Sequence, residues 1–139
     1  MSPFQRPVRQ FPLVRQYMTT SPHTVAPVSS LAAARRVMRE HSVRHLPVLE
    51  GGRVVGLLSE RDLFLVESVP GVNPTNLPVE EAMVEDVFTV DPDAPVGDVI
   101  ETMIERKLGS AVVCEGDRVV GVFTTIDALQ ALRELLERP

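Results

Sequence analysis

Hydrophobic and polar positions follow two periods along the chain, and the same order of elements occurs twice. Apolar residues spaced three and four apart predict helices, and short apolar runs around Gly51-Gly52 and Gly116-Asp117 predict hairpins. The predicted elements are a strand around 24–25, a helix with Leu31, Ala34 and Met38, strands at 43–49 and 53–58, a helix at 60–69, a strand around 89–90, a helix with Val96, Val99, Ile100 and Met103, strands at 111–115 and 118–123, and a helix at 126–137.

Capping residues mark where the helices begin. Ser29 or Ser30 precedes the first helix, and a hydroxyl there accepts a hydrogen bond from an otherwise unpaired N–H group. In the second copy Asp93 is the expected cap, and Pro95 is expected in the first helical turn, where its missing N–H costs nothing. Each copy thus has the predicted order strand, helix, strand, strand, helix.

The chain is a duplication. Shifted by 65 residues, positions 14–68 align with 79–133 without a gap and give 15 identities in 55 positions. Average amino-acid usage would give about three or four identities by chance. The sequence therefore predicts a basic arm at 1–13, a first repeat at 14–69, a linker rich in Pro, Gly and Asn at 70–78, and a second repeat at 79–137.

Composition excludes several classes of protein. The 139 residues are 44% apolar and 24% charged, which excludes a disordered chain, and no apolar run approaches the roughly 20 residues of a membrane span. The start of the chain has no apolar run typical of a secretory signal, and the single cysteine, Cys114, cannot form an intramolecular disulfide. We expect Cys114 to be a small core residue and the protein to be cytoplasmic.

Charge is distributed unequally between the two repeats. The net charge of −5 argues against nucleic-acid binding, which stays open only through Arg6, Arg9 and Arg15. Positions 14–68 carry seven Lys/Arg and five Asp/Glu, whereas positions 79–133 carry four and twelve. The repeats are therefore expected to share a shape but to differ in electrostatics, at +2 and −8.

One motif carries candidate chemistry in both copies. A glycine, two apolar residues, a hydroxyl residue and an aspartate three positions later occur at 56–62 and 121–127. The pattern predicts a strand that ends at a helix start, with the hydroxyl as N-cap. One interpretation is a capping box, although the box favours Glu or Gln and we expect the shorter Asp to reach back less well. The other is a nucleotide site, because aspartates bind ribose hydroxyls and helix N-termini bind phosphate.

The stretches VRHLPVLEGGRVVGLLSERDL and GSAVVCEGDRVVGVFTTIDAL resemble the cystathionine β-synthase (CBS) domain. Two such domains in tandem form a Bateman module in that family. The resemblance implies an α/β (α+β) fold in which two repeats pack with pseudo-two-fold symmetry and leave two clefts. In the family these clefts bind adenine nucleotides or related adenosine compounds. No catalytic domain is attached, so the chain resembles a stand-alone module.

The resemblance also assigns ligand contacts. It places Asp62 and Asp127 on ribose, and Ser59 and Thr124 on phosphate. Each base pocket would combine one repeat's first and second strands with the other repeat's motif. The two implied pockets are Thr24, Leu46 and Pro47 with Thr124 and Asp127, and Thr89, Ala111 and Val112 with Ser59 and Asp62.

Several charged side chains distinguish the two sites. Arg61 precedes Asp62 and is able to pair with phosphate, whereas its counterpart Ile126 is not. Arg44 and His45 enter a strand where they face either a phosphate or solvent. Their counterparts are Gly109 and Ser110, and Ser110 is kept as a candidate contact. His23 and His41 lack the spacing of metal ligands, so no metal is expected.

Two functional hypotheses remain. The first is a regulatory module that senses an adenosine-containing ligand and signals to an unknown partner protein; the second is a ligand-free interaction scaffold. No nucleophile triad, P-loop or metal cluster indicates an enzyme or an obligatory cofactor. We also expect a homodimer, because the helices carry more apolar surface than a small monomer hides. The residues on which this expectation rests are Leu63, Phe64, Val66, Leu129, Leu132, Leu135 and Leu136.

Overall fold

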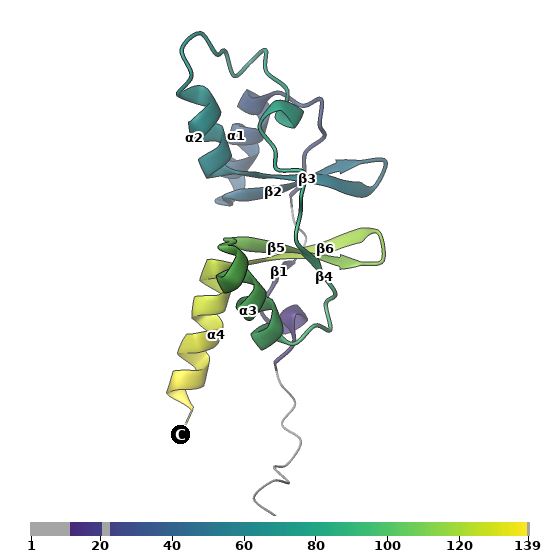
Figure 1. Ribbon diagram of the computed structural model, residues 1–139, viewed down its shortest axis with the longest axis vertical. Helices are drawn as coiled ribbons and strands as arrows, with labels where there is room; N and C mark the ends of the chain where they lie inside the picture. Colours follow the sequence, from purple (N-terminus) through teal and green to yellow (C-terminus); the bar gives the residue numbers. More distant parts are fainter. Residues whose placement is uncertain (1–11, 21–22, 139) are drawn as a thin grey trace, which may run out of the picture.

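The computed structural model describes residues 12–20 and 23–138, so the basic arm expected at 1–13 lies almost entirely outside the described residues. Two stacked halves each carry a pair of helices on the outer side of a sheet (Figure 1). The elements in chain order are η1 (Val14–Gln16), β1 (Thr19–Thr20), α1 (Leu31–His41), β2 (His45–Glu50), β3 (Arg53–Ser59), α2 (Glu60–Glu67), η2 (Val79–Glu81), β4 (Thr89–Val90), α3 (Val96–Arg106), β5 (Ser110–Glu115), β6 (Arg118–Thr124) and α4 (Thr125–Glu137).

The two hairpins form as the sequence predicts. β2 pairs antiparallel with β3, and β5 pairs antiparallel with β6, with the register shifting at Val48 and at its counterpart Val113. Gly51, Gly52 and Gly116 have φ values of +59°, +81° and +62° in the connecting turns, a region that favours glycine. The repeated Gly-containing turns are therefore required by the backbone geometry.

The helix starts confirm one capping prediction and correct another. Ser30 caps α1, since its hydroxyl accepts the Ala33 N–H at 3.0 Å. Asp93 does not cap α3: Pro95 is the N-cap, with no side-chain bond. The Asp93 N–H donates instead to the Asp91 carboxylate, and the Asp93 carboxylate pairs with Arg15. The Asp93 carboxylate is therefore occupied by Arg15 and does not accept a hydrogen bond from the first N–H groups of α3.

The expected strand around 24–25 is reduced to a single parallel bridge between Val25 and Val48. Its counterpart is a short strand, β4, which pairs in parallel with β5. The sequence did not predict β1, which pairs antiparallel with the far edge of β6 through Thr19 and Val122. β1 thereby joins the second repeat's sheet, although it precedes the first repeat in the chain.

Each repeat donates a segment to the other. Val14, from η1 at the start of the first repeat, is fully buried in the core of the second, and Val79 is fully buried in the core of the first. Val84 likewise bridges to Leu57 of β3. The predicted linker also packs on the first repeat, where Leu77 contacts the core and its carbonyl accepts the Leu31 N–H at 2.9 Å.

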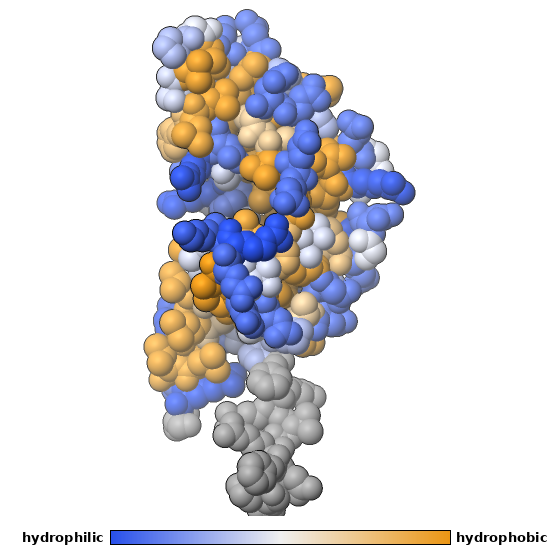
Figure 2. Space-filling view, in the orientation of Figure 1, coloured by the Kyte–Doolittle hydropathy of each residue, from blue (hydrophilic) through white to orange (hydrophobic). Residues whose placement is uncertain are grey.

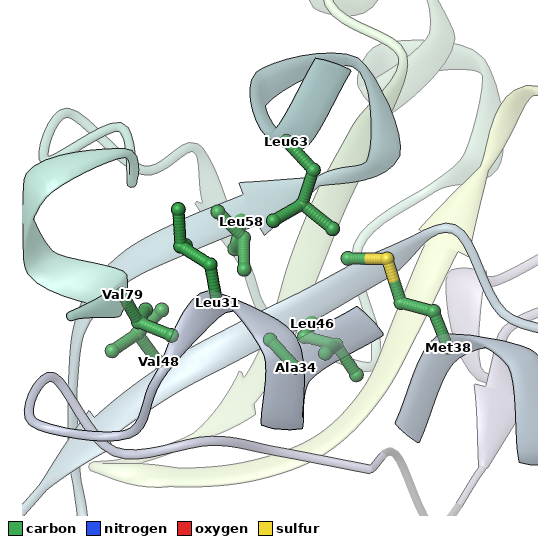
Figure 3. Close-up of a cluster of buried hydrophobic side chains, with 8 residues drawn as sticks. All are labelled: Leu31, Ala34, Met38, Leu46, Val48, Leu58, Leu63 and Val79. Atoms are coloured by element: carbon green, nitrogen blue, oxygen red, sulfur yellow. The ribbon is translucent and has the colours of Figure 1, made fainter. Parts of the chain in front are cut away.

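Two separate hydrophobic cores lie beneath the two helix pairs. The first core, drawn in Figure 3, consists of Leu31, Ala34, Met38, Leu46, Val48, Leu58, Leu63 and Val79. The second consists of Val14, Val96, Val99, Met103, Ala111, Val113 and Phe123. Cys114 is only half-buried, and burial raises its thiol pKa. Among the described residues, no helix is both long and apolar enough to cross a membrane.

The helix faces differ in part from the surface expected for a homodimer. Leu63 is a core residue with 0% exposure, and Val66 is half-buried against the same core, so neither offers a free apolar surface. The reason is that α2 turns these two positions toward β2 and β3. The other expected positions are exposed, namely Phe64, Leu129, Leu132, Leu135 and Leu136.

Candidate functional site between the repeats

Both motifs form complete capping boxes. The Ser59 hydroxyl accepts the Asp62 N–H at 3.1 Å, and Asp62 Oδ2 accepts the Ser59 N–H at 2.9 Å and the Ser59 hydroxyl at 2.8 Å. Thr124 and Asp127 repeat the arrangement at 3.3, 2.8 and 3.1 Å. The expectation that Asp reaches back less well is wrong here, because the extended N-cap backbone brings its own N–H within reach of the short side chain.

The two aspartates differ in their second oxygen. Asp127 is 7% exposed, and its Oδ1 accepts the Thr19 hydroxyl at 3.4 Å. Asp62 is half-buried, and no hydrogen bond from the described residues reaches its Oδ1. The position equivalent to Thr19 is Val84, which has no hydroxyl to donate. Of the two aspartates, Asp62 is therefore the one whose Oδ1 can accept a further hydrogen bond.

Thr19 is a site residue that the sequence analysis missed. It comes from β1, which lies beside β6, and it is the residue that brings the N-terminal segment to the second motif. The signal was weak, because two threonines before a serine and a proline resemble a loop as much as a strand. Its counterpart Val84 also differs in chemistry, so the internal repeat did not reveal it.

His45 lies where the two repeats meet. A Cβ added at Gly109 would lie 3.8 Å from His45 Nε2, so the first residue of β2 faces the residue that precedes β5. Burial lowers the pKa of His45 below its usual 6.5, which Arg44 reinforces and Asp62 and Glu60 oppose. The imidazole is consequently held in its neutral form at neutral pH, beside the carboxylate of the first motif.

Acidification is expected to destabilise the protein through His45. The pKa of His45 is lower in the folded than in the unfolded state, so below about pH 6.5 the unfolded chain binds more protons than the folded chain. The free energy of unfolding therefore decreases as the pH is lowered through this range. In urea unfolding at pH 7.5 and 5.5, a His45→Gln variant should lose less stability on acidification than the wild type. Equal losses in the two proteins would contradict this assignment.

The residues assigned to base pockets divide into core and edge positions. Leu46, Ala111 and Val112 have 0% exposure, and Pro47 is also fully buried, so their side chains are core in this structure. Thr24 is half-buried and Thr89 is exposed; the neighbouring Val25 N–H donates to the Pro47 carbonyl, and Thr89 pairs with Val112. Thr24 thus lies next to a residue bonded to Pro47, and Thr89 lies beside Val112, whereas the apolar candidates have no accessible surface.

The remaining candidates lie around the motifs. Arg44 and Arg61 are exposed, and Ser110 is 6% exposed. The Arg44 carbonyl accepts the Glu60 N–H at 2.9 Å, and at the equivalent place the Gly109 carbonyl accepts the Thr125 N–H at 3.1 Å. The residue before β2 and the residue before β5 are therefore each bonded to the first residue of the helix that follows the motif of the same repeat. In the first repeat this bond places Arg44 and His45 beside Asp62.

The structure shows few groups suited to other chemistry. His23 and His41 stack with ring centroids 3.5 Å apart. Within the described ranges, no group of three or more His, Cys, Asp or Glu residues is placed to hold a metal ion. Two hollows, of about 590 and 420 Å³, lie on the helical side, the first between α1, α2 and the linker and the second between α3 and α4.

The fold and site define a class: a tandem pair of α+β repeats, related by pseudo-two-fold symmetry, with a capped strand-to-helix motif at each junction. The CBS domain family matches residues 14–68 and 79–134. The chain belongs to the CBS domain family and contains two CBS domains.

Relatives carry this pair in different settings. The inosine-5'-monophosphate dehydrogenase of Korarchaeum cryptofilum is 33% identical over 105 residues, covering 75% of this chain but only 21% of the enzyme. An uncharacterized conserved protein from Pyrococcus horikoshii is 32% identical, with a TM-score of 0.78 over 95% of this chain and 100% of that one. The CBS domain pair of protein MJ0100, crystallised with 5'-methylthioadenosine and S-adenosyl-L-methionine, is 25% identical, with a TM-score of 0.78 over 87% and 99%.

Proposed function

We propose that the chain is a non-catalytic regulatory module that binds an adenosine-containing ligand, of the AMP, ADP, ATP or S-adenosylmethionine class, between its two repeats. The observation that carries the proposal is the Asp62 carboxylate. Its Oδ2 is fixed by the capping box, while its Oδ1 receives no bond from the described residues and is available to a ribose hydroxyl. The adenosyl ligands crystallised with the MJ0100 pair support this choice of ligand class.

The contacts proposed for the ligand follow from the chemistry of each group. Asp62 and Asp127 would hold ribose, and Thr24 and Thr89 would lie at the edges of the base pockets. The Ser59 and Thr124 hydroxyls already donate to the aspartates, so a phosphate would depend more on cationic side chains. Those side chains are Arg44, Arg61 and, when protonated, His45. Leu46, Pro47, Ser110, Ala111 and Val112 would meet a base only if the cleft opened.

A second candidate function is a ligand-free scaffold. The complete capping boxes favour it, because they explain both hydroxyl–aspartate pairs as structural features of the helix starts. Under this alternative the module would act through protein contacts alone. The cytoplasmic location and the regulated partner remain predictions under either candidate.

Mass spectrometry of small molecules released from the purified, denatured protein tests these candidates. An adenosine compound at a substantial fraction of the protein concentration is expected. Calorimetric titration of the stripped protein with AMP, ADP, ATP and S-adenosylmethionine covers the case in which purification removes the ligand. Absence of a released adenosine compound together with no heat from any of the four would reject the sensor and favour the scaffold.

We propose in addition that the module is a homodimer that pairs through its helices. Apolar side chains gather along one edge of the molecule over α2 and α4, where orange patches are visible in Figure 2. Phe64 and Leu65 of α2 are 57% and 60% exposed, and Leu136 of α4 is 76% exposed. Large exposed apolar patches of this kind mark interaction sites.

A further inference from the structure

The glycine of each motif is in close contact with a methionine from the segment that the other repeat donates. Met18 packs against the second core, and Met83, 65 positions later, packs against the first. A Cβ added at Gly121 would lie 2.7 Å from Met18 Sδ. One added at Gly56 would overlap Met83 Sδ. These contacts are too short for any side chain larger than glycine, so in both repeats a thioether fills the space that the missing Cβ leaves.

The residue that follows each methionine bonds the donated segment to the motif strand. Thr19 pairs with Val122 of β6, and its hydroxyl donates to Asp127. Val84 exchanges two backbone hydrogen bonds with Leu57 of β3, each 2.9 Å long. In both repeats the methionine side chain therefore lies one residue from the bonds that keep the donated segment on the motif strand.

These two methionines are also the accessible ones among the described residues. Met18 and Met83 are half-buried at the edges of the two cores. Met38 and Met103, the other methionines that the structure describes, are only 4% and 6% exposed and belong to the cores themselves. Because a thioether reacts only with an oxidant that reaches its sulfur, Met18 and Met83 are open to oxidation whereas the core pair is protected.

We infer that Met18 and Met83 are a pair of oxidation sites, and that their conversion to methionine sulfoxide by hydrogen peroxide releases the donated segments from the motif strands. The sulfur lone pair attacks one peroxide oxygen and the O–O bond breaks. The leaving hydroxide takes the proton of the transferred oxygen and departs as water. Sulfur is oxidised by two electrons and the peroxide is reduced by two. This inference does not depend on the proposed ligand or on the proposed homodimer.

The sulfoxide does not fit the space that the thioether fills. Its added oxygen enlarges a side chain that already touches the strand backbone, and enlarging a packed side chain is destabilising. The oxygen also needs a hydrogen-bond donor, but the Leu57 and Val84 N–H groups beside Met83 are bonded to each other's carbonyls. In the second repeat the released segment takes Thr19 with it, so Asp127 Oδ1 loses its donor. Oxidation therefore acts on both motifs.

Peptide mapping by mass spectrometry after brief treatment with hydrogen peroxide tests the selectivity of oxidation. The full chain carries Cys114→Ala, so that its thiol does not react with the peroxide. Met18 and Met83 are expected to form sulfoxide at least about tenfold faster than the two core methionines. Equal rates at the four positions, or faster reaction in the cores, would overturn the inference.

Amide hydrogen exchange measures the release of the segments. After oxidation, the Leu57 and Val84 amides and those of β1 should exchange at least about tenfold faster. Met18→Leu with Met83→Leu is the matched control, because leucine has a similar volume and does not react with peroxide, which should leave its exchange unchanged. Met18→Gln with Met83→Gln introduces a polar group of similar length and should exchange fast without peroxide. Sulfoxide formation in the Cys114→Ala protein with unchanged exchange, or equal acceleration in the leucine variant, would overturn the inference.

Discussion

Replacing both Asp62 and Asp127 with alanine is expected to weaken binding of the adenosine ligand about 10- to 150-fold at each site. The reason is that a lost hydrogen bond to a charged group costs about 1.5–3 kcal/mol. Calorimetry with AMP, ADP, ATP and S-adenosylmethionine measures the affinity. A double variant that holds its ligand as tightly as the wild type would show that the ribose assignment is wrong.

A matched control is needed because the same aspartates also belong to capping boxes. Ser30→Ala removes the cap of α1, which lies outside the proposed site, and should cost about 0.5–2 kcal/mol of stability. Its ligand affinity should equal that of the wild type. If Ser30→Ala weakens binding as much as the aspartate substitutions do, general loss of stability explains both effects.

The two single variants should differ. Asp62→Ala is expected to cause the larger loss, because Asp62 Oδ1 is available whereas Asp127 Oδ1 accepts the Thr19 hydroxyl. Arg44 and Arg61 also lie on the Asp62 side, so the difference should shrink as salt rises. Equal losses that salt leaves unchanged would remove the argument from charge asymmetry.

Leu63→Ala is expected to destabilise the protein by about 2–5 kcal/mol, as for other buried leucines replaced by alanine. Leu63 is fully buried between α1, α2 and the first sheet (Figure 3). Leu65 lies two positions along the same helix and is 60% exposed, so Leu65→Ala should change stability by no more than about 0.5 kcal/mol in a monomer. Urea unfolding at dilute protein concentration compares the two. Similar effects would mean that α2 packs differently.

The features that the sequence predicted correctly are local or repeated. The hairpins follow from glycines in turns that require positive φ, and the caps at Ser30, Ser59 and Thr124 follow from hydroxyls placed directly before helices. The family follows from motifs that recur in register. For the hairpins and caps the physical cause lies within a few residues of the position, and the repeat is visible when the sequence is compared with itself, so a single sequence contains both.

The features that the sequence did not predict depend on distant contacts. Nothing near Val14 indicates that it packs in the second repeat's core, because its partners lie about eighty or more positions away. Leu63 and Phe64 are adjacent and both apolar, so only the packing of α2 decides which one is buried. Within the site, the contact of Thr19 with Asp127 depends on β1 crossing to β6, which no local pattern encodes.

The exchange of segments between the repeats has a consequence for folding during synthesis. The first core has all its parts once residue 84 has left the ribosome, since Val79, Ala82 and Met83 come soon after that repeat, directly after the linker. The second core needs Val14 and β1, which are made first, and β6, which is made about a hundred positions later. The N-terminal segment therefore completes its sheet only when most of the chain has been made, and deletion of either β1 or β6 would damage the same sheet.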